Sequence, residues 1–255
     1  MTVLDDQDFV SLKFDGIWAA AHFIHDQVLF YSRNNQLKLK RNRYNYERII
    51  PNNSILIGEL MYGQQWANHP SRKGKFYAFD AVRIGDSDFQ TAPFHARYAH
   101  LENFSTEIVQ HFANAEEQLR QGLQLVKQFP IRYVEELWQQ HVLTGEFEGL
   151  VFRRADGDYF DTLKRCKLHF NVDAFVTGFE EGSRRLAGTL GALVCKQSTD
   201  GPEFAVGGGL SDSLRHEIWA NKSAYLNRWC IVETEKLFES GIPRHPRFIG
   251  WRYDK

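Results

Sequence analysis

The feature that most restricts the fold of this chain is a change of pattern near residue 172. Before that point, β-type runs such as 28–32 and 55–60 are separated by Gly, Asn and Pro residues and are followed by helical spacing. After it, five or so β-type runs alternate with Gly-rich turns. A chain of 255 residues can bury two separate cores. We therefore expect two domains, one over 1–172 and one over 173–255.

Helical spacing is confined to the later part of the first domain. Apolar residues recur every three or four positions from Ile108 to Val126, which predicts one helix that Pro130 ends. A shorter helix is expected over 134–142, and a β-type run follows at 149–153.

The second domain has the pattern of a small β-barrel. Its β-type runs lie at 174–179, 192–196, 203–206 and 229–235, with one brief helix over 212–220. Short strands of this number, joined by Gly-rich turns, favour an all-β OB-fold.

Composition narrows the class of protein. The apolar share of 43% and the charged share of 25% are those of an ordinary globular protein. Cys166, Cys195 and Cys230 are too few and too widely spaced for a disulfide framework or a zinc site. The acidic N-terminus has no apolar h-region, and no stretch is long enough to span a membrane. We expect an intracellular protein without a signal peptide.

The net charge of −1 argues weakly against a nucleic-acid binder, which is often basic. The basic residues nevertheless cluster locally, at 33–43, 72–75, 153–154, 164–167 and 184–185. Segregated charge can form one basic face on a neutral protein. Solvated loops are the alternative interpretation for any single cluster.

The segment with the most chemical character is Lys13-Phe14-Asp15-Gly16. A lysine fixed between strands can be partly desolvated, and such an amine is a nucleophile. Alone, KxDG is short and common, and a surface lysine before a turn is the alternative. KxDG becomes significant because an ordered series of further motifs follows it. These are SRNN at 32–35, GEL at 58–60, FYAFD at 76–80, EGLV at 148–151, LKRCK at 163–167, RHPRF at 244–248 and RYDK at 252–255.

This series resembles the collinear nucleotidyltransferase motifs of ATP-dependent DNA ligases, from the active-site KxDG to the terminal RxDK. The Gly-rich segments at 187–194 and 206–212 are similar to the OB domain of small DNA ligases. The resemblance covers nearly the whole chain. It implies an α+β nucleotidyltransferase (ATP-grasp-like adenylation) domain of antiparallel sheets flanked by helices, followed by an OB-fold barrel.

The resemblance also implies an activity. We expect a minimal ligase that seals 3′-OH/5′-phosphate nicks in duplex DNA through a lysyl-AMP enzyme and an adenylated DNA intermediate. It would use ATP and Mg²⁺, with Mn²⁺ as the alternative metal, and act as a monomer in DNA replication, repair or recombination.

Roles in the adenylate site follow residue by residue from the resemblance. Lys13 looks like the lysine that takes AMP from ATP, and Asp15 like the motif carboxylate that orients the site. Glu59 matches the glutamate on the ribose and a metal ligand, and Phe79 matches the aromatic that stacks on adenine. Glu148 matches the carboxylate that supports the catalytic metal. Without the series, Glu59 would be a solvent-facing strand residue and Phe79 plain core.

The phosphate-binding residues implied by the resemblance are basic. Lys167 matches the second lysine of a KxK motif on the α-phosphate, and its partner is Arg165 or the adjacent Lys164. Arg33 matches an arginine that grips the nick 5′-phosphate, a task that suits a bidentate guanidinium. The other expected DNA-binding residues are Lys38, Lys40 and Arg41. The expected OB residues over the β- and γ-phosphates are Arg244, Asp254 and Lys255.

Two positions depart from the family pattern. Trp18 stands where arginine is usual, and Ile57 stands where aspartate is usual. Arg97 matches a family arginine of structural role. The short segment between Val194 and Phe204 leaves little room for a long DNA-wrapping loop, so we expect an open clamp with steep salt dependence.

Two alternatives remain. One is an RNA ligase or an mRNA-capping guanylyltransferase of the same superfamily, because the terminal RxDK occurs in capping enzymes too. The other is a non-catalytic nucleic-acid-binding relative, which Trp18 and Ile57 keep open.

Overall fold

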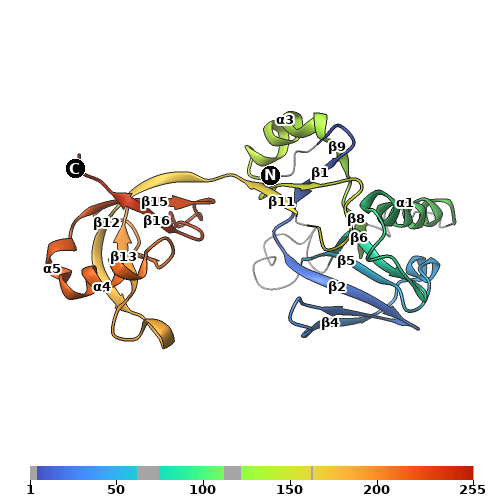
Figure 1. Cartoon of the computed structure of the whole chain (residues 1–255), viewed down its shortest axis with the longest axis horizontal. Helices are drawn as coiled ribbons and strands as arrows, with labels where there is room; N and C mark the ends of the chain where they lie inside the picture. The colour runs from blue at the N-terminus through green and yellow to red at the C-terminus, as the bar shows by residue number, and fades with distance from the viewer. Residues whose placement is uncertain (1–4, 62–74, 112–121, 162, 255) are drawn as a thin grey trace. The chain divides into compact units, whose positions relative to one another are not determined.

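The computed structural model describes residues 5–61, 75–111, 122–161 and 163–254 (Figure 1). The chain divides into two compact units, Met1–Cys166 and Lys167–Lys255. The change of pattern seen near residue 172 falls inside strand β12 (Phe170–Glu181), so it marks the first long strand of the second unit. Within the described residues, no helix is long and apolar enough to cross a membrane.

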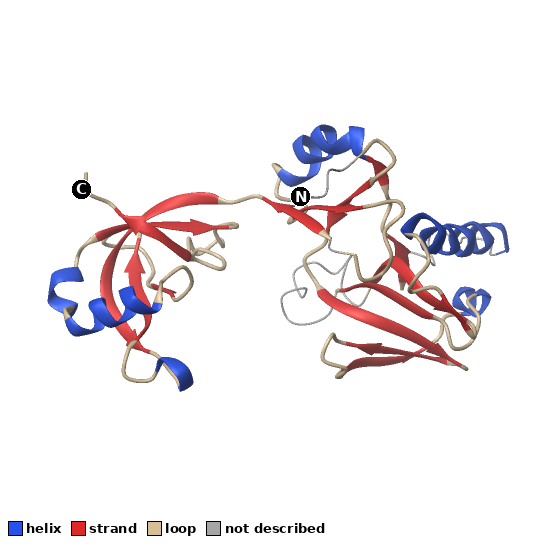
Figure 2. Ribbon diagram, viewed as in Figure 1, coloured by secondary structure: helices blue, strands red, loops and turns tan. Residues whose placement is uncertain are grey.

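The larger sheet of the first unit is built mainly from antiparallel hairpins (Figure 2). Its strands are β2 (Ile17–Ile24), β3 (Gln27–Tyr31), β4 (Leu37–Asn42), β5 (Ile55–Leu60), β6 (Phe76–Ile84), β7 (Ser87–Asp88) and β8 (Leu123–Leu125). They follow the order β4-β3-β2-β5-β6-β7, and β8 pairs with β6 in parallel. In β2, Ala19, Ala21 and Phe23 are buried, and Trp18 lies on the opposite face because side chains alternate along a strand.

Helix α1 (Phe94–His111) covers the buried face of this sheet. Phe94, Tyr98, Leu101 and Ile108 are spaced three, four or seven residues apart, so they form one apolar stripe toward the core. The 3₁₀ turn η1 (Asn45–Ile49) adds Tyr46 to the same core. The opposite face of the sheet carries Trp18 and Glu59, which lie across from each other in the β2–β5 register.

The prediction of one helix from Ile108 to Val126 is wrong at its C-terminal end, and its residues 112–121 lie outside the described residues. Ile108 belongs to α1, but Leu123 begins β8, and Pro130 lies in a short strand rather than at a helix end. The β8 segment is held by β6: the Phe76 N–H donates to the Gly122 carbonyl and the Val126 N–H to the Ala78 carbonyl, both at 2.8 Å. Pairing with a buried strand thus overrides the apolar spacing of the segment.

A second, four-stranded sheet completes the first unit. Its order is β11 (Lys164–Lys167), β10 (Gly149–Arg153), β1 (Phe9–Lys13) and β9 (Phe129–Pro130). The helix expected over 134–142 is confirmed as α3 (Val134–Leu137), which continues into a π-helical turn, η4 (Trp138–Val142). A 3₁₀ turn, η3 (Ile131–Tyr133), precedes it.

The second unit is a curled five-stranded antiparallel sheet with its own core. The order is β14 (Phe204–Val206), β13 (Leu190–Lys196), β12, β15 (Trp229–Thr234) and β16 (Arg247–Trp251). The expected helix is confirmed as α4 (Asp212–Ala220), and the shorter elements are η5 (Arg184–Leu186) and α5 (Lys222–Tyr225). The Ser211 hydroxyl caps α4 by accepting the Leu214 N–H at 3.2 Å.

Candidate active site

The end of β1 brings Lys13 against β10. Lys13 lies opposite Gly149 in the antiparallel register, and the Glu148 N–H donates to the Lys13 carbonyl at 3.1 Å. The Lys13 Nζ donates to Glu148 Oε2, so the ammonium and the carboxylate form an ion pair. The two side chains are 18% and 8% exposed. The predicted nucleophile is therefore largely desolvated and paired with the predicted metal carboxylate.

The Glu59 side chain reaches the Lys13 site from β5. It lies opposite Trp18 on β2, and its Oε1 accepts the Gly16 N–H at 3.0 Å. A Cβ at Gly16 would stand 2.7 Å from the Met61 sulfur and 2.9 Å from Glu59 Cγ, so this position requires glycine. Burial raises the pKa of Glu59 to about 7, with Glu148 and Asp15 adding to the rise, although the Gly16 N–H and Lys13 oppose it.

A small apolar cluster supports the Lys13 turn. Met61, Tyr77 and Val126 are buried together, and Phe14 and Phe79 pack against them. The Phe14 ring stacks on Tyr77 with 4.3 Å between centroids. The residue between Lys13 and Asp15 is thus anchored in the apolar cluster, which fixes the direction of the KxDG turn.

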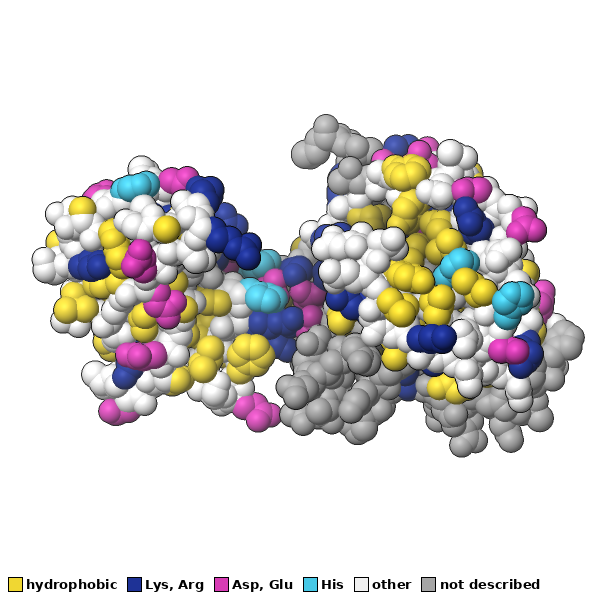
Figure 3. All heavy atoms as spheres, turned by 90° about the horizontal axis from the view of Figure 1, so that it is seen from below, with side chains coloured by type: hydrophobic (Ala, Val, Ile, Leu, Met, Phe, Trp, Pro, Cys, Tyr) yellow, Lys and Arg dark blue, Asp and Glu magenta, His cyan; other side chains and the backbone are white. Residues whose placement is uncertain are grey.

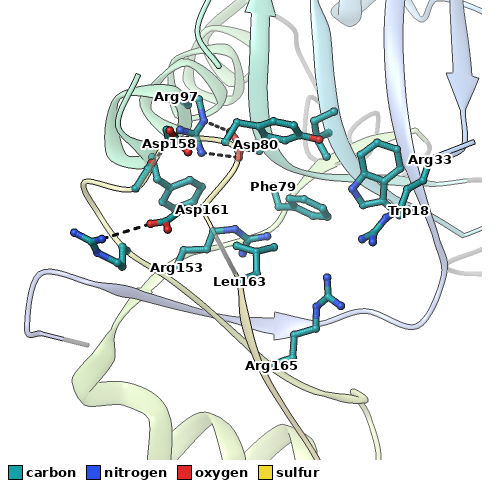
Figure 4. Close-up of a pocket in the computed structure, with 15 residues that line it drawn as sticks. Trp18, Arg33, Phe79, Asp80, Arg97, Arg153, Asp158, Asp161, Leu163 and Arg165 are labelled. Atoms are coloured by element: carbon teal, nitrogen blue, oxygen red, sulfur yellow. Dashed lines mark hydrogen bonds and ion pairs between the residues drawn. The ribbon is translucent and has the colours of Figure 1, made fainter. Parts of the chain in front are cut away.

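Two adjoining cavities open at this site, and Figure 4 shows the residues that line the larger one. The cavity at Lys13 has a volume of about 240 Å³ and contains Glu59. The neighbouring cavity, of about 560 Å³, extends toward Asp80 and Asp158. Both are lined by Trp18, Arg33, Phe79, Arg153, Leu163 and Arg165. The aromatic face of Phe79 therefore lies on the boundary between them.

Arg153 is a site residue that the sequence analysis counted only as part of a basic cluster. It is 5% exposed, its Nη1 donates to Ser11 Oγ at 3.2 Å, and its guanidinium lies 4.7 Å from the Phe79 ring centroid. Burial lowers its pKa to about 10. Strand alternation was the available signal, because Val151 and Arg153 share a face of β10 and both line the Lys13 cavity.

The other cavity arginines come from different elements. Arg33 follows β3 and lies over the Trp18 ring, with 5.3 Å between the guanidinium carbon and the centroid. Arg165 lies in β11, and alternation directs Lys164 to the opposite face from Arg165. This favours Arg165 as the first basic residue of the KxK-like motif. Among the described residues, no ion pair joins Arg33, Arg153 or Arg165 to a carboxylate.

Arg97 is held for structural reasons, in keeping with its expected role. It is 2% exposed, and its guanidinium binds Asp80 in bidentate fashion, at 2.8 and 2.9 Å. This pair closes the far wall of the larger cavity.

The three DNA-binding candidates of β4 lie in different surroundings. Lys40 and Arg41 lie on opposite faces of the strand, and Lys38 lies at a register shift in the β3–β4 pairing. Arg41 donates to both carboxylate oxygens of the fully buried Glu47 and lies 4.5 Å from the Tyr44 ring centroid. Arg41 thus secures the η1 turn, whereas Lys40 is exposed. In the view of Figure 3, Lys and Arg side chains form separate groups interspersed with Asp and Glu.

The remaining candidates belong to the second unit. The Lys167 ammonium donates to Glu235 Oε1 at 2.7 Å. Arg244 is half-buried, and its carbonyl accepts the Thr234 hydroxyl at 2.7 Å. Asp254 is exposed, 3.7 Å from Arg252, and Lys255 lies outside the described residues. Within unit 1 the structure brings together Lys13, Asp15, Glu59, Phe79, Glu148, Arg33 and Arg165.

Arg252, the first residue of the RYDK motif, is held by an ion pair within the second unit. Its guanidinium binds both carboxylate oxygens of Asp173, at 2.8 and 3.2 Å.

The carboxylates beside Lys13 are ligands of the kind that Mg²⁺ prefers. No group of three metal-ligating side chains occurs in the described part of the chain. Glu59 and Glu148 nevertheless interact electrostatically beside Lys13. Mg²⁺ is commonly held by one or two carboxylates together with substrate phosphates. Glu59, which lines the cavity, and Glu148, which contacts the Lys13 amine, match that requirement.

Comparisons with known proteins agree with this arrangement. Residues 8–169 match the RNA ligase family model, and residues 181–252 match the DNA ligase OB-like domain. A search of curated proteins finds no match. A solved structure from a structure–function study of Lig E DNA ligases, which concerns DNA binding with a minimal scaffold, has a TM-score of 0.70 at 21% identity, covering 98% of this chain and 94% of its own.

Two further structures have the same fold. They are described as Pmar-Lig_PreS3 and Pmar-Lig_Pre, with TM-scores of 0.69 and 0.70 at 21% and 19% identity. They cover 96% and 97% of this chain, which spans only 63% and 64% of their length. At these identities the structures establish the fold, and the match over 8–169 establishes the family. The chain therefore belongs to the nucleotidyltransferase ligases, with an RNA ligase-type domain over 8–169 followed by a DNA ligase OB-like domain over 181–252.

Proposed function

We propose that this protein is an ATP-dependent DNA ligase that seals nicks through a lysyl-AMP intermediate on Lys13. The observation that carries the proposal is the pairing of the Lys13 amine with Glu148 in a cavity that also contains Glu59 and Phe79. An amine, a carboxylate pair and an aromatic ring on the cavity wall are the groups that adenylate transfer from ATP requires.

In the first step, the Lys13 nitrogen attacks the α-phosphorus of ATP. A nitrogen–phosphorus bond forms, the bond to the pyrophosphate oxygen breaks, and pyrophosphate leaves. Glu148 contacts the Lys13 nitrogen and is placed to accept its proton. Phe79 stacks on the base and Glu59 accepts a hydrogen bond from the ribose. A Mg²⁺ held by Glu148 and Glu59 would neutralise phosphate charge.

In the second step, a 5′-phosphate oxygen of the nick attacks the AMP phosphorus, and the Lys13 nitrogen leaves with a proton. Arg33 and Arg165 neutralise the phosphates, because no carboxylate of the described residues forms an ion pair with either. In the third step, the 3′-hydroxyl attacks the 5′-phosphate, its proton is lost, and AMP leaves. Positioning and charge neutralisation account for most catalysis in such transfers.

The polynucleotide substrate has two candidates. DNA is supported by the DNA ligase OB-like match over 181–252 and by the Lig E DNA ligase fold. RNA is supported by the RNA ligase match over 8–169. We place DNA first because the OB domain match and the full-length fold match both come from DNA ligases.

The experiment follows label from ATP to nucleic acid. The full chain is incubated with Mg²⁺ and α-labelled ATP, and the acid-precipitated protein is counted. Wild type and Lys222→Ala should retain label, whereas Lys13→Ala should retain none. Labelled enzyme is then mixed with nicked DNA and with nicked RNA. Absence of protein-bound label in wild type contradicts the proposal, and sealing of RNA alone shows that the RNA alternative is correct.

A further inference from the structure

Trp18 and Arg33 form a pair at the edge of the large sheet. The β2–β3 ladder ends with Ala20 opposite Tyr31. Trp18 and Arg33 lie two residues beyond these positions, so continuation of the register brings them side by side on one face. The guanidinium carbon of Arg33 is 5.3 Å from the Trp18 ring centroid, and Figure 4 shows the two side chains together. Both line the two cavities.

The backbone around Arg33 is fixed by a tight turn. The Ser32 N–H donates to the Gln36 carbonyl and the Asn35 N–H to the Ser32 carbonyl, both at 2.9 Å. Asn35 adopts the left-handed conformation, with φ of 53°, which asparagine tolerates better than most residues. The turn therefore sets where the Arg33 stem begins, but it leaves the long side chain free to rotate.

The indole is the group that directs this side chain. Arg33 is exposed, and none of the ion pairs among the described residues includes it. A guanidinium over an indole face is attracted by the ring quadrupole. Because Arg33 would otherwise lose rotamer freedom on binding, a ring that already orients it reduces the cost of gripping an anion.

We propose that Trp18 is a positioning residue: its indole holds the Arg33 guanidinium on the cavity wall, oriented for the terminal 5′-phosphate of a nick. This inference rests on the proposed function. A second arginine at position 18 would repel Arg33 until phosphate arrived, whereas the indole attracts it beforehand. The site then grips the terminal phosphate with one preoriented guanidinium.

The test measures preference for a terminal phosphate. Full-length enzyme preloaded with AMP is titrated, in EDTA, with nicked duplexes that carry a 5′-phosphate or a 5′-hydroxyl. The variants are Trp18→Leu, Trp18→Phe, Arg33→Ala and the double variant Trp18→Leu/Arg33→Ala. Tyr133→Leu is the matched control, because Arg132 lies 5.1 Å from the Tyr133 centroid and neither residue lines the two cavities.

Trp18→Leu should lower the preference for the 5′-phosphate about fivefold, the effect of losing one partly exposed cation–π contact. Trp18→Phe should keep most of it, and Tyr133→Leu should keep all of it. The double variant should equal Arg33→Ala, because the indole acts through the guanidinium.

Three results would overturn the inference. Trp18→Leu and Trp18→Phe could both keep the phosphate preference. The double variant could fall well below Arg33→Ala, which would mean that the indole contacts substrate directly. Loaded wild-type enzyme could bind both duplexes equally. Failure of wild type to take up AMP at all would instead reject the proposed function on which the inference rests.

Discussion

The carboxyl of Glu59 makes the electrostatics of the site measurable as a pH dependence of stability. Burial raises its pKa from the ordinary 4.5 to about 7. Between these values the carboxyl is protonated in the folded chain and ionised in the unfolded chain, so unfolding releases a proton. Stability contributed by this group is therefore lost as the pH rises from 4.5 to 7.

The expected size follows from the two pKa values. Each pKa unit corresponds to about 1.4 kcal/mol. The rise from 4.5 to about 7 therefore lowers the free energy of unfolding by about 3 kcal/mol between acid and neutral pH. Glu59→Gln cannot ionise and its amide oxygen can still accept the Gly16 N–H. As the pH rises, the free energy of unfolding of Glu59→Gln should therefore increase relative to that of wild type by about this amount.

The assay is urea denaturation of both proteins at several pH values from about 5 to 8, in EDTA. Glu102→Gln, on the exposed side of α1, is the control and should track wild type. The reasoning is refuted if the stability difference between Glu59→Gln and wild type is the same at every pH, because then the Glu59 carboxyl would titrate alike in both states.

Three further expectations concern packing, charge and salt. Asp80→Asn leaves the buried Arg97 without its ionic partner and should destabilise the protein by about 3 kcal/mol or more, read from the denaturation midpoint. Gly58→Ala would place a Cβ 2.3 Å from the Tyr77 carbonyl oxygen and should cost about 1–3 kcal/mol, whereas Gly250→Ala, with nothing within 4 Å, should change the midpoint little. If Arg33, Lys38 and Lys40 each neutralise one phosphate, binding of nicked duplex should weaken about 40-fold from about 50 to about 200 mM salt. A shallow slope in a filter-binding titration would contradict that estimate.

The runs at 28–32 and 55–60, which form β3 and β5, and the α4 helix could be predicted because their patterns are local. A run of β-type residues bounded by turn residues and a run with helical spacing depend on neighbouring residues alone. The stretch from Ile108 to Val126 could not, because its outcome depends on β6, some 45 residues earlier at Phe76–Ile84. Parallel pairing with a buried strand leaves no mark in the spacing of the segment that joins it.

The site residues divide in the same way, into features that the local sequence predicts and features that long-range strand pairing creates. That Lys13 is a nucleophile candidate could be inferred from the ordered motifs, but its contact with Glu148, 135 residues away, is created by the pairing of β1 with β10. Arg41 and Arg153 look alike in the sequence as members of basic clusters. The fold separates them, because Arg41 meets Glu47 whereas Arg153 faces the cavity beside Phe79.

Ion pairing with a carboxylate, rather than the net charge of the chain, distinguishes the arginines that build the fold from those that face the cavity. Arg97 is neutralised by Asp80 and Arg252 by Asp173, so these guanidiniums contribute little to the electrostatic potential of their surroundings. Arg33, Arg153 and Arg165 share one cavity wall, and no ion pair among the described residues neutralises them. Because acidic residues elsewhere balance the total, a chain with a net charge of −1 can still concentrate positive potential at this cavity. The neutral composition, which argued against a nucleic-acid partner, therefore has no weight once the ion pairs are assigned.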